Sequence, residues 1–123
     1  MTNADEIVQE QLDAYNNKDL EAWLNTYANN AVQSTTEGEI LADGREQMAK
    51  NMVIRFAEPD LFAKLLHRIV CDNTVVDHEI ITRNFPEGKG TIEMLCIYQV
   101  ENGLIHKGQF KVFNKVLTTD NAN

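Results

Sequence analysis

The sequence predicts an α+β domain in which helices come first and an antiparallel sheet follows. Up to Pro59 the apolar residues recur three and four positions apart, as on one face of a helix. After Asp60 they alternate with polar residues, as in strands that are buried on one side. Helices followed by strands with short connections are the element order of an α+β fold.

Two helices are expected at the start of the chain. Ile7 and Leu12 lie on one face of the first helix, and Asn3 with Glu6 can form a capping box at its beginning. The apolar residues of the segment 20–27 are again three and four apart, which predicts a second, short helix.

A short irregular strand and a third helix are expected next. The strand is placed at 31–36. Asp43 and Glu46 form another cap-like pair that opens the helix, and Pro59 ends it.

Four strands are predicted after the helices, at 62–71, 74–84, 91–100 and 104–114. The connections between them contain Asn, Asp, Gly or Pro, which are the residues that favour turns. Short connections of this kind make neighbouring strands antiparallel.

Alternation also predicts which side chains face the helices on the concave side of the sheet. In the strand predicted at 74–84, positions 76, 78, 80 and 82 carry fewer charged residues than the positions between them. His78 is therefore expected on the concave side, with Asp77 and Glu79 on the convex side. The later strands contribute apolar sets to the concave side, namely Ile92, Met94, Cys96, Tyr98 and Val100, then His106, Gly108, Phe110 and Val112.

Two hairpin registers follow from the turn residues. A two-residue turn at 72–73 sets Arg68 opposite Asp77 outside and His67 opposite His78 at the pocket, whereas a three-residue turn brings Arg68 beside His78 inside. The two-residue turn is favoured because it leaves Arg68 and Asp77 paired and exposed to water.

A three-residue loop at 101–103 places Tyr98 opposite His106 and Cys96 opposite Gly108, because a two-residue turn would bury two lysines. This register predicts a cavity bordered by Cys96, Tyr98, Gly108, Phe110 and His78.

Length and composition predict one domain over 1–117 and a polar tail at 118–123. The net charge of −8 argues against nucleic-acid binding. No apolar run approaches the ~20 residues of a membrane span, and the polar first residues are unlike a signal peptide, so a cytoplasmic location is expected.

The cysteines and histidines form no metal-binding motif. Cys71 and Cys96 are isolated and are expected to be reduced and mostly buried, and the three histidines lack zinc spacing. No metal or cofactor is therefore expected.

Several motifs along the chain resemble those of one family. They are AYNNKD at 14–19 ahead of Trp23, YANNA at 27–31, DGRE at 43–46, HRIV at 67–70, VVDHE at 75–79 and IYQVENGLI at 97–105. Over about residues 5–114 the chain resembles the NTF2-like superfamily, in its SnoaL-like and ketosteroid-isomerase-like branch. The resemblance implies a cone-shaped curved sheet wrapped around three helices, a pocket at its wide end for a small hydrophobic molecule, and a homodimer.

The ketosteroid-isomerase pattern itself does not carry over. It places Gln11 at the oxyanion tyrosine, Thr35 at the carboxylate base and Cys96 at the protonated acid, and none of the three can perform these roles. The usual carboxylate mechanism of steroid isomerisation is thus excluded at these positions.

His78 is the candidate general acid or base, with a structural histidine as the alternative interpretation. The candidate ligand-binding residues are Tyr15, Tyr98, Cys96, Gly108, Phe110 and His67. Two classes of function remain open: a small enzyme acting on a hydrophobic metabolite by proton transfer, cyclisation or hydrolysis, and a non-catalytic ligand-binding or dimerisation module. Leu95 and Ile97 on the convex face favour dimerisation.

Overall fold

The computed structural model describes residues 3–118 and has the predicted order of helices and then sheet. The helices are α1 (Ala4–Asn16), α2 (Leu20–Leu24) and α3 (Arg45–Phe56). The strands are β1 (Tyr27–Thr35), β2 (Ile40–Asp43), β3 (Phe62–Cys71), β4 (Thr74–Phe85), β5 (Gly88–Glu101) and β6 (Leu104–Leu117). The tail predicted at 118–123 lies, apart from Thr118, outside the described residues.

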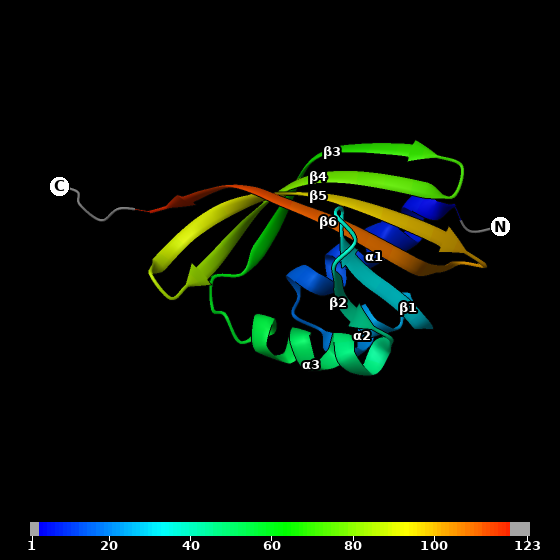
Figure 1. Ribbon diagram of the computed structural model, residues 1–123, viewed down its shortest axis with the longest axis horizontal. Coiled ribbons are helices and arrows are strands. Elements are labelled where there is room, and N and C mark those ends of the chain that lie inside the picture. Colours follow the sequence, from blue (N-terminus) through cyan, green and yellow to red (C-terminus); the bar gives the residue numbers. More distant parts are fainter. Residues whose placement is uncertain (1–2, 119–123) are drawn as a thin grey trace.

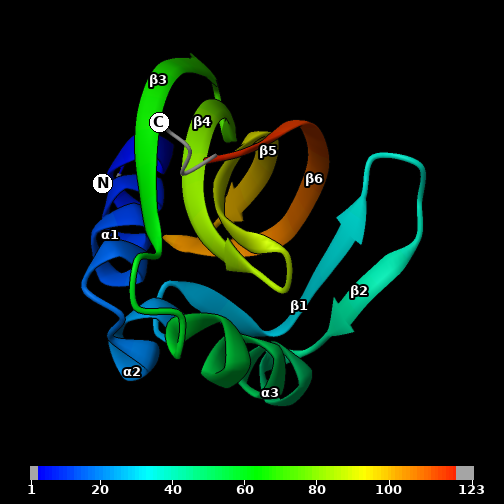
Figure 2. The ribbon, with the colours of Figure 1, turned by 90° about the vertical axis from the view of Figure 1, so that its left-hand side faces the viewer.

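The strands form one curved sheet in the order β2-β1-β6-β5-β4-β3. From β3 to β6 it is the predicted antiparallel meander, while β1 joins β6 in parallel and β2 folds back on β1. Figure 1 shows the helices gathered beneath the meander, and Figure 2 shows how strongly β3–β6 curl. The α+β class and the curved sheet around the helices are confirmed.

The segment between α2 and α3 differs from the prediction. The second helix ends at Leu24, and Tyr27 begins β1 instead of completing the helix. At this end the backbone N–H and the hydroxyl of Thr26 both donate to the Trp23 carbonyl, at 3.2 and 2.7 Å. Strand β2 was not predicted, and Asp43 belongs to it, so that Gly44 is the N-cap of α3.

The assignment of faces in β4 is wrong. Asp77 and Glu79 are buried on the concave side with exposed fractions of 0% and 4%, together with Val75 and Ile81, and His78 lies on the convex side. The prediction placed charged residues on the solvent side, whereas Asp77 is paired with a cation inside the fold. Arg68 donates to its two carboxylate oxygens at 2.7 and 2.9 Å.

The register of the first hairpin is confirmed, with Arg68 opposite Asp77 and His67 opposite His78. The sides are reversed, however. The guanidinium of Arg68 also donates to Gln9 of α1 at 2.9 Å, so the charge pair faces the helices and the imidazoles face outward. The expected external ion pair and internal histidine pair are therefore wrong.

The register of the last hairpin is also wrong. Asn102 and Gly103, both with positive φ, form a two-residue turn, and an irregularity follows between Gln99 and Val100. Tyr98 therefore lies opposite Gly108 and Cys96 opposite Phe110. The bulge restores the alternation after the short turn, so that the lysines of β6 stay outside.

The core lies between the helices and the concave face. Val8 of α1, Trp23 of α2, Met48 of α3 and Tyr98 of β5 are all at most 2% exposed within it. Among residues 3–118 none of the helices combines the length and apolar character that crossing a membrane requires.

Candidate ligand site on the concave face of the sheet

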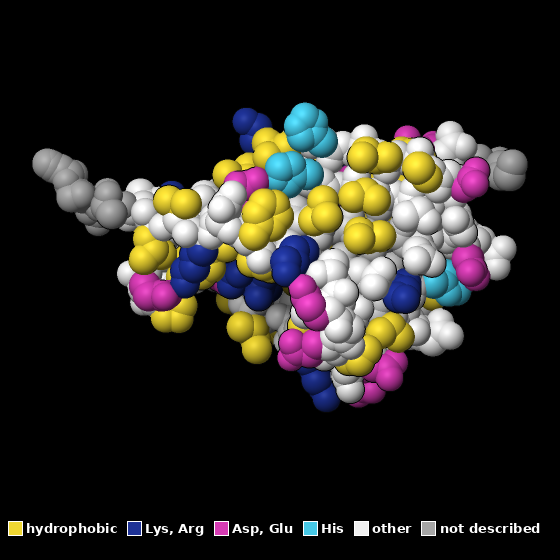
Figure 3. Space-filling model, turned by 45° about the horizontal axis from the view of Figure 1, so that its top comes forward, with side chains coloured by type: hydrophobic (Ala, Val, Ile, Leu, Met, Phe, Trp, Pro, Cys, Tyr) yellow, Lys and Arg dark blue, Asp and Glu magenta, His cyan; other side chains and the backbone are white. Residues whose placement is uncertain are grey.

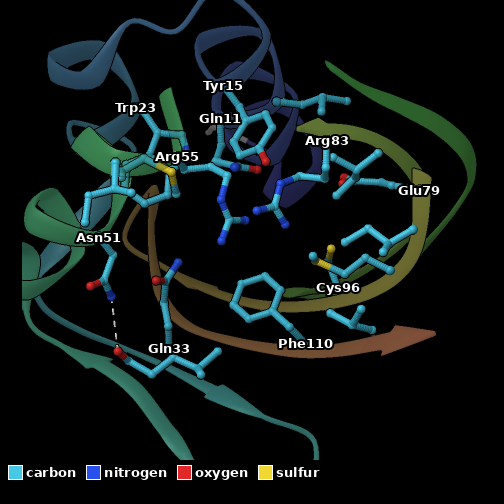
Figure 4. A pocket seen from close by; sticks show the side chains of 18 of the residues that line it. Gln11, Tyr15, Trp23, Gln33, Asn51, Arg55, Glu79, Arg83, Cys96 and Phe110 are labelled. Atoms are coloured by element: carbon cyan, nitrogen blue, oxygen red, sulfur yellow. Dashed lines mark hydrogen bonds between the residues drawn. The ribbon is translucent and has the colours of Figure 1, made fainter. Parts of the chain in front are cut away.

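A cavity of about 620 Å³ lies between the helices and the concave face of β4, β5 and β6. Apolar side chains form most of its wall, among them Leu12, Trp23, Met52, Ile81, Ile92, Met94 and Phe110. The polar groups come from α1, β1, α3 and β4, as Figure 4 shows: Gln11, Tyr15, Gln33, Asn51, Arg55, Glu79 and Arg83. This volume is in the range of small-molecule sites.

Glu79 is the acidic group in this wall. Its side chain is 4% exposed, and its immediate neighbour on the same face of β4 is the fully buried Asp77. Burial, followed by the charge of Asp77, raises the pKa of Glu79 to about 7, against the opposing effects of Arg68 and Cys96. A carboxyl group with this pKa can both accept and release a proton near neutral pH.

The neighbouring Asp77 is paired with Arg68. The two-pronged contact between them is buried on the aspartate side and 16% exposed at the arginine side chain. The same contact raises the pKa of Arg68, so its charge is permanent. This pair gives Glu79 a fixed negative neighbour, which favours its protonated form.

Three buried polar atoms next to the cavity have no hydrogen-bond partner within residues 3–118. They are Oε1 of Gln11, Nε1 of Trp23 and the hydroxyl of Tyr27. All three residues line the cavity. Burial raises the pKa of Tyr27, so its hydroxyl stays a donor. Since unsatisfied buried polar groups are costly, their presence at a cavity points to a polar ligand atom.

Two arginines approach the same space from the side opposite Cys96. Arg83 donates through Nε and Nη2 to Glu58 at 2.8 Å each, and Nε of Arg55 lies 3.5 Å from the same carboxylate. Burial raises the pKa of Tyr15 to about 12, although both arginines act to lower it. Tyr15 is therefore a neutral donor beside two cations.

Four of the predicted ligand-binding residues line the cavity: Tyr15, Cys96, Tyr98 and Phe110. The rings of Tyr98 and Phe110 meet edge to face with centroids 5.9 Å apart. Burial raises the pKa values of Cys96 and Tyr98, so both stay neutral, and Cys96 is not an activated nucleophile. Cys71, expected to be mostly buried, is exposed.

Gly108 and the two histidines are not part of this wall. A Cβ atom at Gly108 would lie 2.9 Å from the Phe110 ring, so the glycine makes room for that ring rather than for a ligand. His78 stacks between His67 and Phe113 on the convex face, and its Nε2 is 2.7 Å from Glu93. The expected concave position of His78 is wrong.

Sequence reasoning missed Glu79 because it assumed that charged residues face solvent. One available signal pointed the other way. Val75 and Ile81 share the face of Asp77 and Glu79, and the correct register already placed Arg68 opposite Asp77. A mainly apolar strand face can be buried even when it carries a charged residue, provided that the neighbouring strand supplies a partner of opposite charge.

Within the part of the chain that the structure describes, no three or more His, Cys, Asp or Glu side chains gather as metal ligands would. The polar groups that the cavity presents are acid–base and hydrogen-bonding side chains. What it can do chemically is bind a mainly apolar molecule and exchange a proton with it at Glu79.

Solved structures with the same fold were found at low sequence identity. A cystatin-fold protein from Novosphingobium aromaticivorans is 18% identical, with a TM-score of 0.83 over 90% of this chain and 99% of that one. An NTF2-like protein from Cytophaga hutchinsonii is 18% identical, with a TM-score of 0.76 over 91% of each chain. A candidate polyketide cyclase from Sinorhizobium meliloti is 21% identical, with a TM-score of 0.71 over 86% and 94%.

No curated protein matches the chain in sequence. A family model does: the SnoaL-like domain matches residues 8–107. This match covers most of the chain, and the similar structures share its helices and curved sheet. The chain therefore belongs to the SnoaL-like family, within the NTF2-like fold.

Proposed function

We propose that this SnoaL-like domain binds a small hydrophobic metabolite in the cavity and that Glu79 transfers a proton to and from it. The observation that carries the proposal is a carboxyl group, 4% exposed, in the wall of a mainly apolar cavity, with its pKa raised to about 7. His78, on the opposite face of the sheet, does not reach this cavity.

The reaction class that fits these groups is enolisation. Glu79 as a carboxylate takes a proton from the carbon next to a ketone, and the electrons of that C–H bond form the enolate. The enolate oxygen accepts hydrogen bonds from Nε1 of Trp23 and the hydroxyl of Tyr27, which have no partner within residues 3–118. Glu79 then returns the proton to carbon, or the enolate closes a ring on a second carbonyl group.

This arrangement resembles ketosteroid isomerases in chemistry but takes its base from a different position. The carboxylate comes from β4, whereas the family pattern would require it at Thr35 in β1. The candidate polyketide cyclase among the similar structures is compatible with ring closure as the outcome. A module that only binds would have no need for the costly burial of Asp77 and Glu79 together.

The test is the exchange of α-protons of a bicyclic ketone, 2-tetralone, for deuterium in D₂O, followed by NMR. We expect the protein to accelerate exchange and Glu79→Gln to reduce the acceleration by about 10²- to 10⁴-fold. The matched control is His78→Asn, which should exchange at the parent rate. Thermal-shift binding of 2-tetralone without any accelerated exchange would identify a binding module and contradict the catalytic role of Glu79.

We also propose that the chain forms a homodimer through the convex face of the sheet. Leu66, Ile69 and Phe113 are 39%, 60% and 36% exposed, and Leu95 and Ile97 belong to the same face. Figure 3 shows hydrophobic side chains gathered beside two histidines on this side of the molecule. A second copy would cover this apolar area symmetrically.

A further inference from the structure

The cavity is positively charged at its centre, although the chain as a whole has a net charge of −8. Arg55 comes from the last turn of α3 and Arg83 from the second half of β4. Both guanidinium groups point into the middle of the cavity, toward each other and away from the walls that carry them (Figure 4). Cations are thus placed where a mainly apolar ligand would lie.

Glu58 is shared by these two cations, which leaves one positive charge in excess when Glu79 in the cavity wall is protonated. Its carboxylate accepts Nε and Nη2 of Arg83 at 2.8 Å each and the backbone N–H of Asn84 at 2.9 Å. Nε of Arg55 reaches it only at 3.5 Å. Lys115 at the rim is paired with Glu87 at 2.8 Å and adds no net charge.

The remaining donors face the cavity. Glu58 takes Nε and Nη2 of Arg83 and lies against Nε of Arg55, so Nη1 of Arg83 and the Nη nitrogens of Arg55 are the donors left for a ligand and for the Tyr15 hydroxyl. The Tyr15 hydroxyl lies close enough to feel both charges. Guanidinium groups bind planar carboxylates through such paired N–H donors.

We propose that the metabolite bound in this cavity carries one carboxylate group, seated between Arg55 and Arg83, with its apolar body against Ile81, Ile92 and Met94. The inference rests on the proposed binding function and names its substrate class. With Glu79 protonated, the one excess positive charge matches a carboxylate monoanion, whereas a phosphate monoester would add roughly one more negative charge to a partly buried site.

The experiment compares 2-naphthoate with its neutral analogue 2-acetylnaphthalene by isothermal titration calorimetry at fixed pH and salt. We expect the parent protein to bind 2-naphthoate about tenfold to hundredfold more tightly, the range for hydrogen bonds to charged groups. Arg55→Met, which keeps the apolar stem, should remove this preference. Lys50→Met, on the same helix but outside the cavity, should keep it.

A second variant changes the affinity in the opposite direction. Glu58→Gln removes the carboxylate that competes for both arginines, so the affinity for 2-naphthoate should rise. Equal affinity of the parent for both ligands, a preference that survives Arg55→Met, or tighter binding of 2-naphthyl phosphate would each overturn the inference. The proposed function would survive these results if 2-tetralone still exchanged its protons. Failure of both naphthalenes to bind together with no exchange of 2-tetralone would overturn both.

Discussion

Replacing Glu79 with glutamine should stabilise the protein, and the gain should grow as the pH rises. The amide resembles the protonated carboxyl group but cannot ionise. In the parent, burial raises the pKa of Glu79 from 4.5 to about 7, so the folded state retains a proton that the unfolded chain releases. The parent therefore loses stability as the pH rises from about 4.5 to about 7. A raised carboxyl pKa of this size corresponds to about 3 kcal/mol.

The assay is urea unfolding of the parent and Glu79→Gln at about pH 5 and about pH 8. The stability advantage of the variant should be about 2–3 kcal/mol larger at the higher pH, because part of the effect is already present at pH 5. The other titrating groups are common to both proteins and cancel in the comparison. An advantage that does not change with pH would show that Glu79 titrates normally and would refute the reasoning.

Glu93→Gln is the matched control, with the opposite sign. Hydrogen bonds from Asn114 and His78 lower the pKa of Glu93, so its contribution to stability is present above the carboxyl range and lost as the pH falls through it. This variant should be less stable than the parent at about pH 8, and the difference should shrink on acidification.

Two other substitutions test the ion pair and the convex face. Arg68→Met leaves the fully buried Asp77 without its cation and should cost about 3–5 kcal/mol in urea unfolding near neutral pH, whereas adding Asp77→Leu should recover much of the loss. An Arg68→Met protein that is as stable as the parent would contradict the role of this pair. Leu95→Lys places a charge on the proposed dimer face and should give a monomer by light scattering, while Val53→Lys on the exposed side of α3 should not. A parent protein that is already monomeric at tens of micromolar would exclude the dimer.

The elements and most of their order could be predicted from local patterns. Strand β3 has the predicted bounds, β4 ends one residue later than predicted, and α1 begins after the predicted cap Asn3, because periodicity and turn residues act over a few positions. The two-residue turn that sets Arg68 opposite Asp77 was also readable from Asp72 and Asn73. Strand β2 was missed because its four residues give too short a pattern.

The candidate site was predicted only in part. Cys96 and Tyr98 line the cavity as expected, since β5 alternates without interruption, and Phe110 of β6 lines it opposite Cys96. Gly108 failed as a cavity residue because the space beside it is taken by the Phe110 ring, and the two-residue turn with the irregularity between Gln99 and Val100 places it opposite Tyr98 instead of Cys96. A bulge depends on how two strands pair, and neither strand carries that information alone.

The sequence by itself determined the family, the α+β class, the meander and the aromatic wall of the cavity. Only the tertiary structure decided which face of β4 is buried, and with it that Glu79 rather than His78 meets the cavity. The physical reason is that a buried charge is paired with residues far from it in the sequence. Arg68 on β3 and Gln9 on α1 satisfy the charge at Asp77, so a strand face that looks polar in isolation becomes the interior one.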